Sequence, residues 1–251
     1  MCDGLEIIAH RGASCDAPEN SRSAVELAWR HGADAVEADF RLTRDGRIVA
    51  SHDDSLQRIA GVDWHISDHS LDELRHLDIG GWKAPRWSGE RIATLEELLS
   101  IPHPPAARFY VEIKSGPEIS GELARVASAS DWPQERIVLI CFSARVLVAA
   151  RQLLPVSPTY LVVEFLQDPH TGVWYPDADE CLAEAVRHEL TGLDLMAARA
   201  MDRELIGRIR SAGLDLCVWT VDEEPEARRL IAEGVRRITT NRPALLCHML
   251  R

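Results

Sequence analysis

Short apolar runs recur along the chain, and most of them are followed by a polar turn and an amphipathic helical pattern. Runs of this length without alternation are typical of strands that are buried on both faces of a parallel sheet. Buried strands that alternate with helices indicate an α/β fold. The pattern predicts nine strands, at Leu5–Ala9, Ala35–Phe40, Ile48–Ser51, Phe109–Ile113, Ile137–Phe142, Thr159–Val163, Leu193–Met196, Leu214–Val218 and Arg237–Thr239.

The helical patterns between these strands place apolar residues three and four positions apart. Three of them are followed directly by a glycine, the residue expected where a helix ends. Helices are predicted at Ser21–His31, Ser120–Ser130, Ala144–Leu154, Asp179–Glu189, Arg203–Ala212, Glu224–Glu233 and Ala244–Leu250.

Nine strands are one too many for an eight-stranded barrel, and the segment DFRLTRDGRIVASHD accounts for the surplus. Asp45-Gly46 is a strong signal for a two-residue hairpin loop. With that loop, the antiparallel ladder places Asp39 opposite His52, and Ile48–Ser51 returns along the second strand instead of joining the barrel. The other strands are then all parallel, so we predict a (β/α)8 TIM barrel in one domain that spans residues 1–251.

Residues 53–108 form an insertion between barrel strands two and three. It contains three tryptophans and the helical segment TLEELLS, for which Thr94 is a suitable N-cap. Because the insertion departs from the hairpin, we expect it to cover the C-terminal mouth of the barrel. Long insertions are usually lids or binding elements, and a solvated decoration is the alternative.

The net charge of −12 disfavours a protein that binds nucleic acid or an anionic membrane through its overall field. The longest apolar runs, such as Ile137–Phe142, are far shorter than a membrane-spanning helix requires. No secretory signal pattern is visible, and the six cysteines, Cys2 included, form no CxxC motif. We therefore expect a reduced, cytoplasmic protein without stable membrane association; its oligomeric state stays open.

Acidic residues interrupt the predicted strands near their carboxyl ends, where TIM-barrel enzymes carry their chemistry. Glu37 and Asp39 are two residues apart and point to one face of their strand, and Glu112 lies at the end of the next barrel strand. Three carboxylates at one barrel mouth repel one another unless a cation neutralises them. Oxygen ligands suit a hard ion, so we predict one divalent cation, Mg²⁺ or Ca²⁺, with zinc less favoured. For any single acidic residue a surface salt bridge is the alternative, although unpaired charge is costly in an apolar strand.

Basic residues and histidines reach the same mouth. Beside a metal, Arg11 and Lys114 predict a phosphate site, since arginine donates two parallel hydrogen bonds and lysine supplies a compact charge. A carboxylate partner within the site is the alternative for Lys114. His10 ends the first strand and His52 arrives from the hairpin. Because histidine titrates near neutral pH, the pair can supply acid–base catalysis.

The segment APEN is expected to turn the chain into the first helix, with Asn20 as the N-cap. Glu19 could face the site, but support of the turn is the favoured interpretation. The sequence contains no GxGxxG, P-loop or GxSxG motif, so nucleotide-binding and serine-hydrolase functions lack support.

Taken together, these residues resemble the glycerophosphodiester phosphodiesterase family. The resemblance rests on HRG followed by APEN, then GADAVEADFRLTRDGRIVASHD, YVEIK and VWTVD, and it extends to GGWKAPRWSGERIATLEELL and GVRRITTNRP. It implies a TIM barrel with a small inserted subdomain. It also implies hydrolysis of glycerophosphodiesters, such as glycerophosphocholine or glycerophosphoethanolamine, to sn-glycerol 3-phosphate and an alcohol.

The resemblance also implies roles for individual residues. The catalytic pair would be His10 and His52. Arg11 and Lys114 would contact the phosphate, and Trp219 would border the glycerol moiety. We add Phe142, which ends its own strand, to the substrate-binding residues. The implied metal ligands are Glu37, Asp39 and Glu112.

Two positions depart from the family pattern: Asn241 stands where aspartate is usual, and Cys141 stands where serine is usual. Neither departure removes a proposed ligand.

A lysophospholipase D-like or phospholipase C-like enzyme is the second hypothesis, which an apolar channel or a membrane-binding loop would favour. A non-catalytic barrel that binds a phosphorylated ligand is the third, and it would be expected to lack one of these residues.

Overall fold

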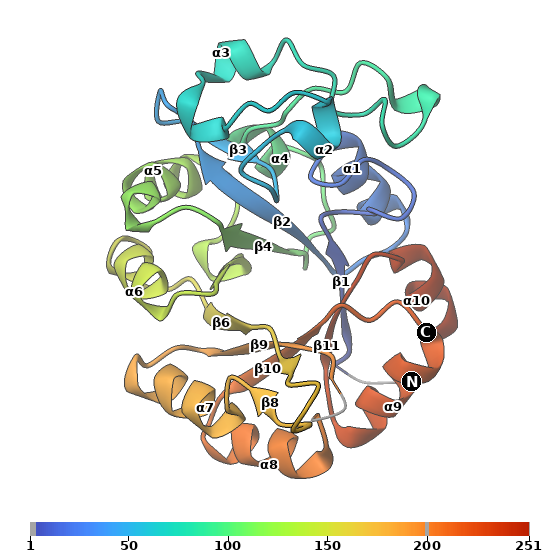
Figure 1. The fold of residues 1–251 in the computed structure, drawn as a ribbon, viewed down its shortest axis with the longest axis vertical. Coiled ribbons are helices and arrows are strands. Elements are labelled where there is room, and N and C mark those ends of the chain that lie inside the picture. Colours follow the sequence, from blue (N-terminus) through green and yellow to red (C-terminus); the bar gives the residue numbers. More distant parts are fainter. Residues whose placement is uncertain (1–3, 199–200, 251) are drawn as a thin grey trace.

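The computed structural model describes residues 4–198 and 201–250, which form a closed barrel of parallel strands surrounded by helices (Figure 1). Within these residues the strands pair in the order β1-β11-β10-β9-β6-β5-β4-β2, and β2 pairs again with β1. The predicted TIM barrel is therefore confirmed. Its strands are β1 (Glu6–His10), β2 (Ala35–Leu42), β4 (Arg108–Ile113), β5 (Ile137–Cys141), β6 (Thr159–Val163), β9 (Gly192–Met196), β10 (Asp215–Trp219) and β11 (Arg237–Thr240).

A helix packs on the barrel between each strand and the next. Between β2 and β4 this helix is α4 (Leu95–Leu99), near the end of the segment 53–108, and it contacts α1, α5 and β3. Thr94 is its N-cap, as predicted, because its hydroxyl accepts from the Glu97 N–H while the Glu97 side chain accepts from the Thr94 N–H. The other barrel helices are α1 (Arg22–Arg30), α5 (Ser120–Ala129), α6 (Ala144–Leu153), α7 (Ala178–Arg187), α8 (Arg203–Ser211), α9 (Glu224–Glu233) and α10 (Pro243–Leu250). Single 3-10 turns lie at Pro117–Ile119 and Gln134–Arg136.

The strand β3 (Ile48–Ala50) pairs antiparallel with β2 and stays outside the barrel, as predicted. The loop between them is longer than predicted. Thr43 N–H donates to Arg47 O at 2.9 Å, so three residues rather than two form the loop. Gly46 ends it with φ +76°, the left-handed conformation that three-residue hairpin loops require.

The longer loop shifts the ladder by one residue and changes the partner of Asp39. Ser51, not His52, donates its N–H to Asp39 O at 2.9 Å. The prediction that His52 lies opposite Asp39 is therefore wrong. His52 lies beyond the end of β3 and approaches the barrel mouth through the chain that follows that strand.

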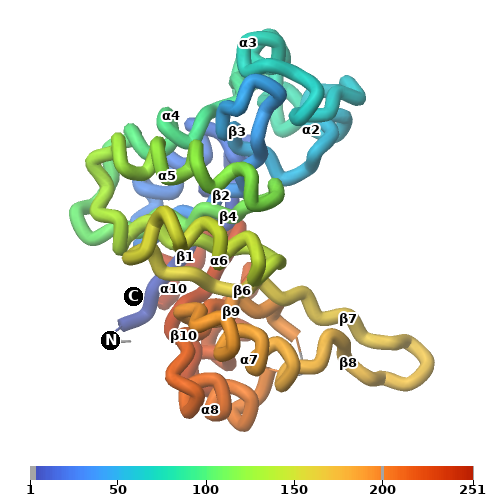
Figure 2. Tube along the Cα trace, turned by 90° about the vertical axis from the view of Figure 1, so that its left-hand side faces the viewer, coloured from blue at the N-terminus to red at the C-terminus, as the bar shows by residue number. Residues whose placement is uncertain are grey.

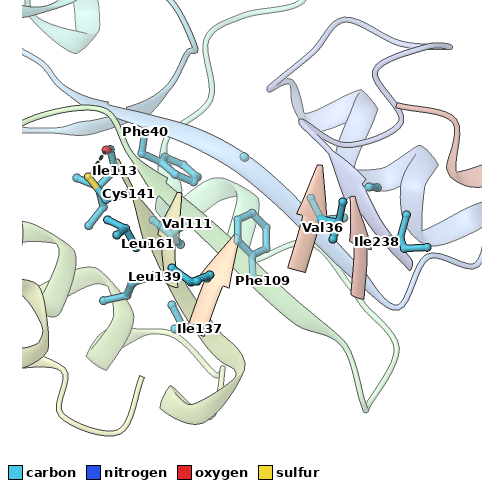
Figure 3. Close-up of a cluster of buried hydrophobic side chains, with 14 of the residues drawn as sticks. Val36, Phe40, Phe109, Val111, Ile113, Ile137, Leu139, Cys141, Leu161 and Ile238 are labelled. Atoms are coloured by element: carbon cyan, nitrogen blue, oxygen red, sulfur yellow. Dashed lines mark hydrogen bonds between the residues drawn. The ribbon is translucent and has the colours of Figure 1, made fainter. Parts of the chain in front are cut away.

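Successive side chains of the barrel strands point to opposite faces. Val36 and Val111 point outward and join the large apolar cluster between the strands and the helices (Figure 3). Glu37 and Glu112, which follow them, point into the barrel. Cys141 belongs to the outward cluster, where its Sγ donates to Ile113 O.

The insertion lies at one side of the barrel beyond β3 and contains α2 (Gln57–Ala60) and α3 (Leu71–Leu74), with 3-10 turns at Ile66–Asp68 and Pro85–Trp87 (Figure 1). It contacts the loop after β1, where Lys83 Nζ donates to Ser14 O at 2.7 Å. Its apolar side chains pack in a cluster of their own together with Val49 of β3. The insertion residues of this cluster are Leu56, Ile59, Ile66, Leu71, Leu74, Ile79 and Ile92.

A second hairpin, absent from the predicted elements, follows β6. Its strands β7 (Leu166–Gln167) and β8 (Trp174–Tyr175) pair antiparallel, and the hairpin projects from the barrel (Figure 2). Each strand has two residues, too few for a periodic pattern to show. Leu166, Val173 and Tyr175 are exposed on it.

No described helix is long and apolar enough to cross a membrane. The thiols of Cys15, Cys141, Cys181 and Cys217 are free. Cys2, one of the six cysteines of the sequence, lies outside the described residues.

Candidate active site

A cavity of about 210 Å³ lies at the carboxyl ends of the barrel strands. It brings together every predicted site residue except Asp39, which is fully buried directly behind Arg11 and Lys114. No residue of the insertion, 53–108, is part of its lining, so the covering role of the insertion stays a prediction. The lining consists of His10, Arg11, Glu37, His52, Glu112, Lys114, Ile140, Phe142, Val162, Glu164, Asp194, Trp219 and Thr239.

The three predicted metal ligands form a compact buried group. β2 carries Glu37 and Asp39, β4 carries Glu112, and the register of these strands sets Asp39 beside Glu112. One carboxylate oxygen from each lies within 4.8 Å of the others. These carboxylates are buried, and within the described residues Lys114 Nζ ion-pairs with Asp39 Oδ1 and Glu112 Oε1, whereas Glu37 Oε1 has no hydrogen-bond partner. Three converging, buried carboxylates at this spacing fit a hard divalent cation.

The charges around this group act in opposite directions. Burial, together with the charges of Asp39 and Glu112, raises the pKa of Glu37 well above its ordinary value. Burial and the charge of Asp39 raise the pKa of Glu112 to about 7. Burial opposes the ionisation of Asp39, but Arg11 and Lys114 outweigh it and lower the pKa of Asp39. Asp39 is therefore the ionised centre of the group, and a bound cation would favour ionisation of the other two.

The turn after β1 holds Arg11 against these carboxylates. Arg11 has φ +56° and Gly12 has φ +76°, both in the left-handed region. A Cβ on Gly12 would lie 2.6 Å from Ala24 C, so this position requires glycine. The Arg11 N–H donates to Glu37 Oε2 at 2.8 Å, and Arg11 Nε lies 3.1 Å from Asp39 Oδ2.

Asn20 is not the N-cap of α1, contrary to the sequence prediction. The cap is Ser21, whose hydroxyl accepts from the Ala24 N–H. Asn20 is buried, and its amide donates to Asp39 Oδ2 at 2.8 Å while its Oδ1 accepts the Asp39 N–H at 3.0 Å. It therefore holds a predicted metal ligand in place rather than a helix end.

His10 is fixed by Asn241. The Asn241 amide nitrogen donates to Asp222 Oδ2 at 2.7 Å, which turns its Oδ1 toward His10 Nδ1, also at 2.7 Å. An amide oxygen can only accept, so this network assigns the proton to Nδ1 and leaves Nε2 with a lone pair. Burial and the charge of Arg11 lower the pKa of His10 to about 4, so the ring is neutral at pH 7.

His52 has a charged partner instead. Its Nδ1 lies 2.7 Å from Asp53 Oδ1, and the other oxygen of Asp53 accepts from Arg58 Nε at 2.6 Å. The pKa of Asp53 is lowered, because the His52 and Arg58 contacts outweigh burial. Asp53 was not among the predicted site residues. Its position directly after His52 was the signal in the sequence that could have identified it.

Lys114 and two aromatic rings form one wall of the cavity. Lys114 Nζ lies 2.5 Å from Glu112 Oε1 and 3.2 Å from Asp39 Oδ1, so the carboxylate partners anticipated as the alternative for Lys114 are present. The Phe142 and Trp219 rings meet edge to face with centroids 6.1 Å apart, and Lys114 Nζ lies 5.3 Å from the Phe142 ring centre. Phe142 is half exposed at the mouth.

Comparison with known proteins agrees with this geometry. The sequence matches the Glycerophosphoryl diester phosphodiesterase family over residues 10–245. The chain belongs to the glycerophosphodiester phosphodiesterase family. It is therefore an enzyme of the phosphoric diester hydrolase class.

Individual members of the family align over nearly the whole chain. The glycerophosphodiester phosphodiesterase of Caldanaerobacter subterraneus is 30% identical over 98% of this chain and 97% of its own. That of Bacillus subtilis is 32% identical over 97% of this chain and 85% of its own. A phosphodiesterase of Oleispira antarctica, solved in complex with the product sn-glycerol-3-phosphate, has the same fold, with a TM-score of 0.83. It is 27% identical and covers 98% of this chain and 97% of its own.

The cavity also contains an acidic residue, Asp194, that sequence reasoning missed. Asp194 on β9 is buried in the cavity wall, and its Oδ1 has no hydrogen-bond partner among the described residues. Burial and the nearby charge of Glu112 raise the pKa of Asp194. An aspartate inside the apolar segment LDLM was the same signal that singled out Glu37. Its carboxyl group can exchange a hydrogen bond with a hydroxyl-bearing ligand.

Proposed function

We propose that this enzyme hydrolyses glycerophosphodiesters, such as glycerophosphocholine and glycerophosphoethanolamine, to sn-glycerol 3-phosphate and an alcohol. One observation carries the proposal: His10 and His52 line a single cavity together with two basic residues and with Glu37 and Glu112 of the acidic group. The sn-glycerol-3-phosphate in the similar Oleispira antarctica structure supports the same product here.

We assign one divalent cation, Mg²⁺ or Ca²⁺, to Glu37, Asp39 and Glu112. The close approach of their buried carboxylate oxygens supports the assignment, because hard cations prefer oxygen ligands. When bound, the cation supplies positive charge that stabilises the phosphoryl oxygens as negative charge develops on them. Arg11 and Lys114 line the cavity beside it and are assigned to the phosphate.

The hydrogen-bond partners of the two histidines support different roles for them. Neutral His10 has its Nδ1–H held by an uncharged amide, so its Nε2 can take the proton of the attacking hydroxyl, which we assign to the glycerol 2-hydroxyl. The Asp53 carboxylate lies 2.7 Å from His52 Nδ1 and orients that ring, and we assign His52 to protonate the leaving alcohol. Attack would form a cyclic phosphate, which water then opens.

Asn241 is expected to matter for turnover through His10. In Asn241→Ala the ring loses the acceptor that fixes its tautomer and orientation, and kcat should fall about ten-fold. Steady-state kinetics with glycerophosphocholine measures this. The matched control is Cys141→Ser at the other departure from the family pattern, which faces the helices and should leave kcat unchanged. An unaltered kcat in Asn241→Ala would remove the positioning role.

Hydrolysis of lysophospholipids is the second candidate, and a specific feature favours it. Phe142 is exposed at the mouth, and the β7–β8 hairpin, which starts two residues after the cavity residue Glu164, exposes Leu166, Val173 and Tyr175. These side chains could contact an acyl chain. We rank this candidate second because carboxylates, basic residues and histidines make up most of the cavity lining.

A substrate comparison separates the two candidates. Glycerophosphocholine and lysophosphatidylcholine both release choline, so one choline assay reports on both. We expect kcat/KM for glycerophosphocholine to be higher by at least about ten-fold. A preference for the lysolipid that disappears when Leu166 and Val173 are changed to serine would reverse the ranking. Release of phosphocholine in place of choline would instead indicate phospholipase C-like cleavage.

A further inference from the structure

We propose that Arg58, on α2 of the insertion, is a positioning residue that holds Arg11 and His52 of the active site at the same time. The roles that it supports, phosphate contact by Arg11 and proton donation by His52, rest on the proposed function. Arg58 itself does not line the cavity. It acts through two carboxylates, Glu19 and Asp53, which lie between it and the site.

The first carboxylate leads to Arg11. Arg58 Nη1 and Nη2 donate to the two oxygens of Glu19, each at 2.8 Å. Glu19 Oε1 also accepts from Arg11 Nη1 at 2.9 Å. The Glu19 side chain is largely buried, so it has little freedom once both arginines are bound. Of the two interpretations given for Glu19 from the sequence, this contact favours the first, because the side chain faces Arg11 of the site.

The second carboxylate leads to His52. Arg58 Nε donates to Asp53 Oδ2 at 2.6 Å, while Asp53 Oδ1 lies 2.7 Å from His52 Nδ1. All three nitrogens of one guanidinium are therefore engaged, two with Glu19 and one with Asp53. A planar arginine fork can satisfy both carboxylates in one plane, whereas the ammonium of a lysine is a single point.

The charge of Arg58 supports this arrangement. It lies between Glu19 and Asp53 and contributes to lowering the pKa of both, so both stay ionised and continue to accept. The Arg58 guanidinium also lies 5.7 Å from the centre of the Trp82 ring, within the insertion. An insertion that does not line the cavity thus still reaches both the phosphate-binding arginine and the proton donor.

An arginine that only links the insertion to the barrel would not position Arg11 and His52. Arg44 is such a residue and provides the comparison. Arg44 follows β2 and also binds the insertion, donating to Glu73 Oε2 at 2.8 Å and to Asp68 O at 2.7 Å. It contacts neither Glu19 nor Asp53 in the described structure. Arg44→Met is therefore a matched control for loss of an arginine contact to the insertion.

The test compares the kinetics of Arg58→Met, Arg58→Lys and Arg44→Met. Arg58→Met should lower kcat/KM by about 10- to 100-fold, with a higher KM from loosened Arg11 and a lower kcat from loosened His52. Arg58→Lys should remain impaired, since one ammonium cannot bind both carboxylates. Arg44→Met should match the parent enzyme. In a Glu19→Ala, Asp53→Ala background, Arg58→Met should add little further loss, because its partners are already gone.

Unchanged kcat and KM in Arg58→Met, or a full additional loss in the double-variant background, would overturn the proposal. Inactivity of the parent enzyme on every glycerophosphodiester would instead reject the proposed function. In that case crystal structures of Arg58→Met and Arg44→Met decide the inference alone. Displaced Arg11 and His52 side chains in the first variant only would support it, and unchanged positions in both would overturn it.

Discussion

Replacing His10 or His52 with alanine is expected to lower kcat on glycerophosphocholine by about 10²- to 10⁴-fold, the usual effect of losing a general acid or base. Without His10 the attacking hydroxyl loses the Nε2 that is assigned to take its proton. Without His52 the alcohol must leave as an alkoxide. Turnover measured for purified variants at matched cation concentration checks both.

The two variants should differ when the leaving group changes. A glycerophosphodiester with a p-nitrophenyl leaving group needs no protonation, so His52→Ala should recover most of its activity on it while His10→Ala does not. The control is His76→Ala, an exposed histidine of the insertion that contacts Asp72 O. Near-wild-type turnover in either active-site variant would reject its assignment, and recovery of His10→Ala instead would exchange the two roles.

The parts of this site that the sequence predicts share a physical cause. Glu37 and Asp39 interrupt an apolar strand, and a buried charge is costly unless something compensates it, so the local pattern alone marks them. The two-residue period of a strand then sets both on one face, and strand ends in a parallel barrel meet at one rim. These arguments need no knowledge of distant contacts.

The hairpin register shows where local reasoning ends. A two-residue loop and a three-residue loop that closes on glycine are both compatible with Asp45-Gly46. The structure takes the second: the Thr43 N–H donates to Arg47 O, and the Arg47 N–H donates to the Thr43 hydroxyl. The dipeptide alone does not determine the loop length, so it leaves the register of the two strands uncertain by one residue.

Other residues were misassigned because their partners are remote in sequence. Asparagine is a preferred residue type at helix N-caps, yet the side chain of Asn20 binds Asp39, nineteen residues further along the chain. Glu19 was expected to support a turn, and it binds Arg58, thirty-nine residues away. Such contacts depend on how the loop after β1 lies against β2 and against the insertion, and neither propensity nor periodicity encodes that placement.

Removal of divalent cations with a chelator is expected to abolish turnover, and added Mg²⁺ or Ca²⁺ should restore it. The reason is the buried acidic group, in which one carboxylate oxygen from each of Glu37, Asp39 and Glu112 lies within 4.8 Å of the others. The same group predicts an effect on stability that does not depend on catalysis. Cation at about 100 times its Kd contributes about 2.7 kcal/mol to folding, which for a chain of this size raises Tm by about 5–10 °C.

Glu112→Gln separates metal binding from a general role of these carboxylates in folding. It keeps the shape of the side chain but removes a carboxyl group whose ionisation is opposed by burial and by the charge of Asp39, so the cation-free variant should melt no lower than the cation-free parent. The rise in Tm with cation and the cation-dependent activity should both be lost. Glu118→Gln, an exposed glutamate in the loop after the same strand, should keep both. Activity that survives exhaustive chelation, with a Tm insensitive to Mg²⁺ and Ca²⁺, would remove the metal from the mechanism and leave charge compensation of the acidic group to Arg11 and Lys114.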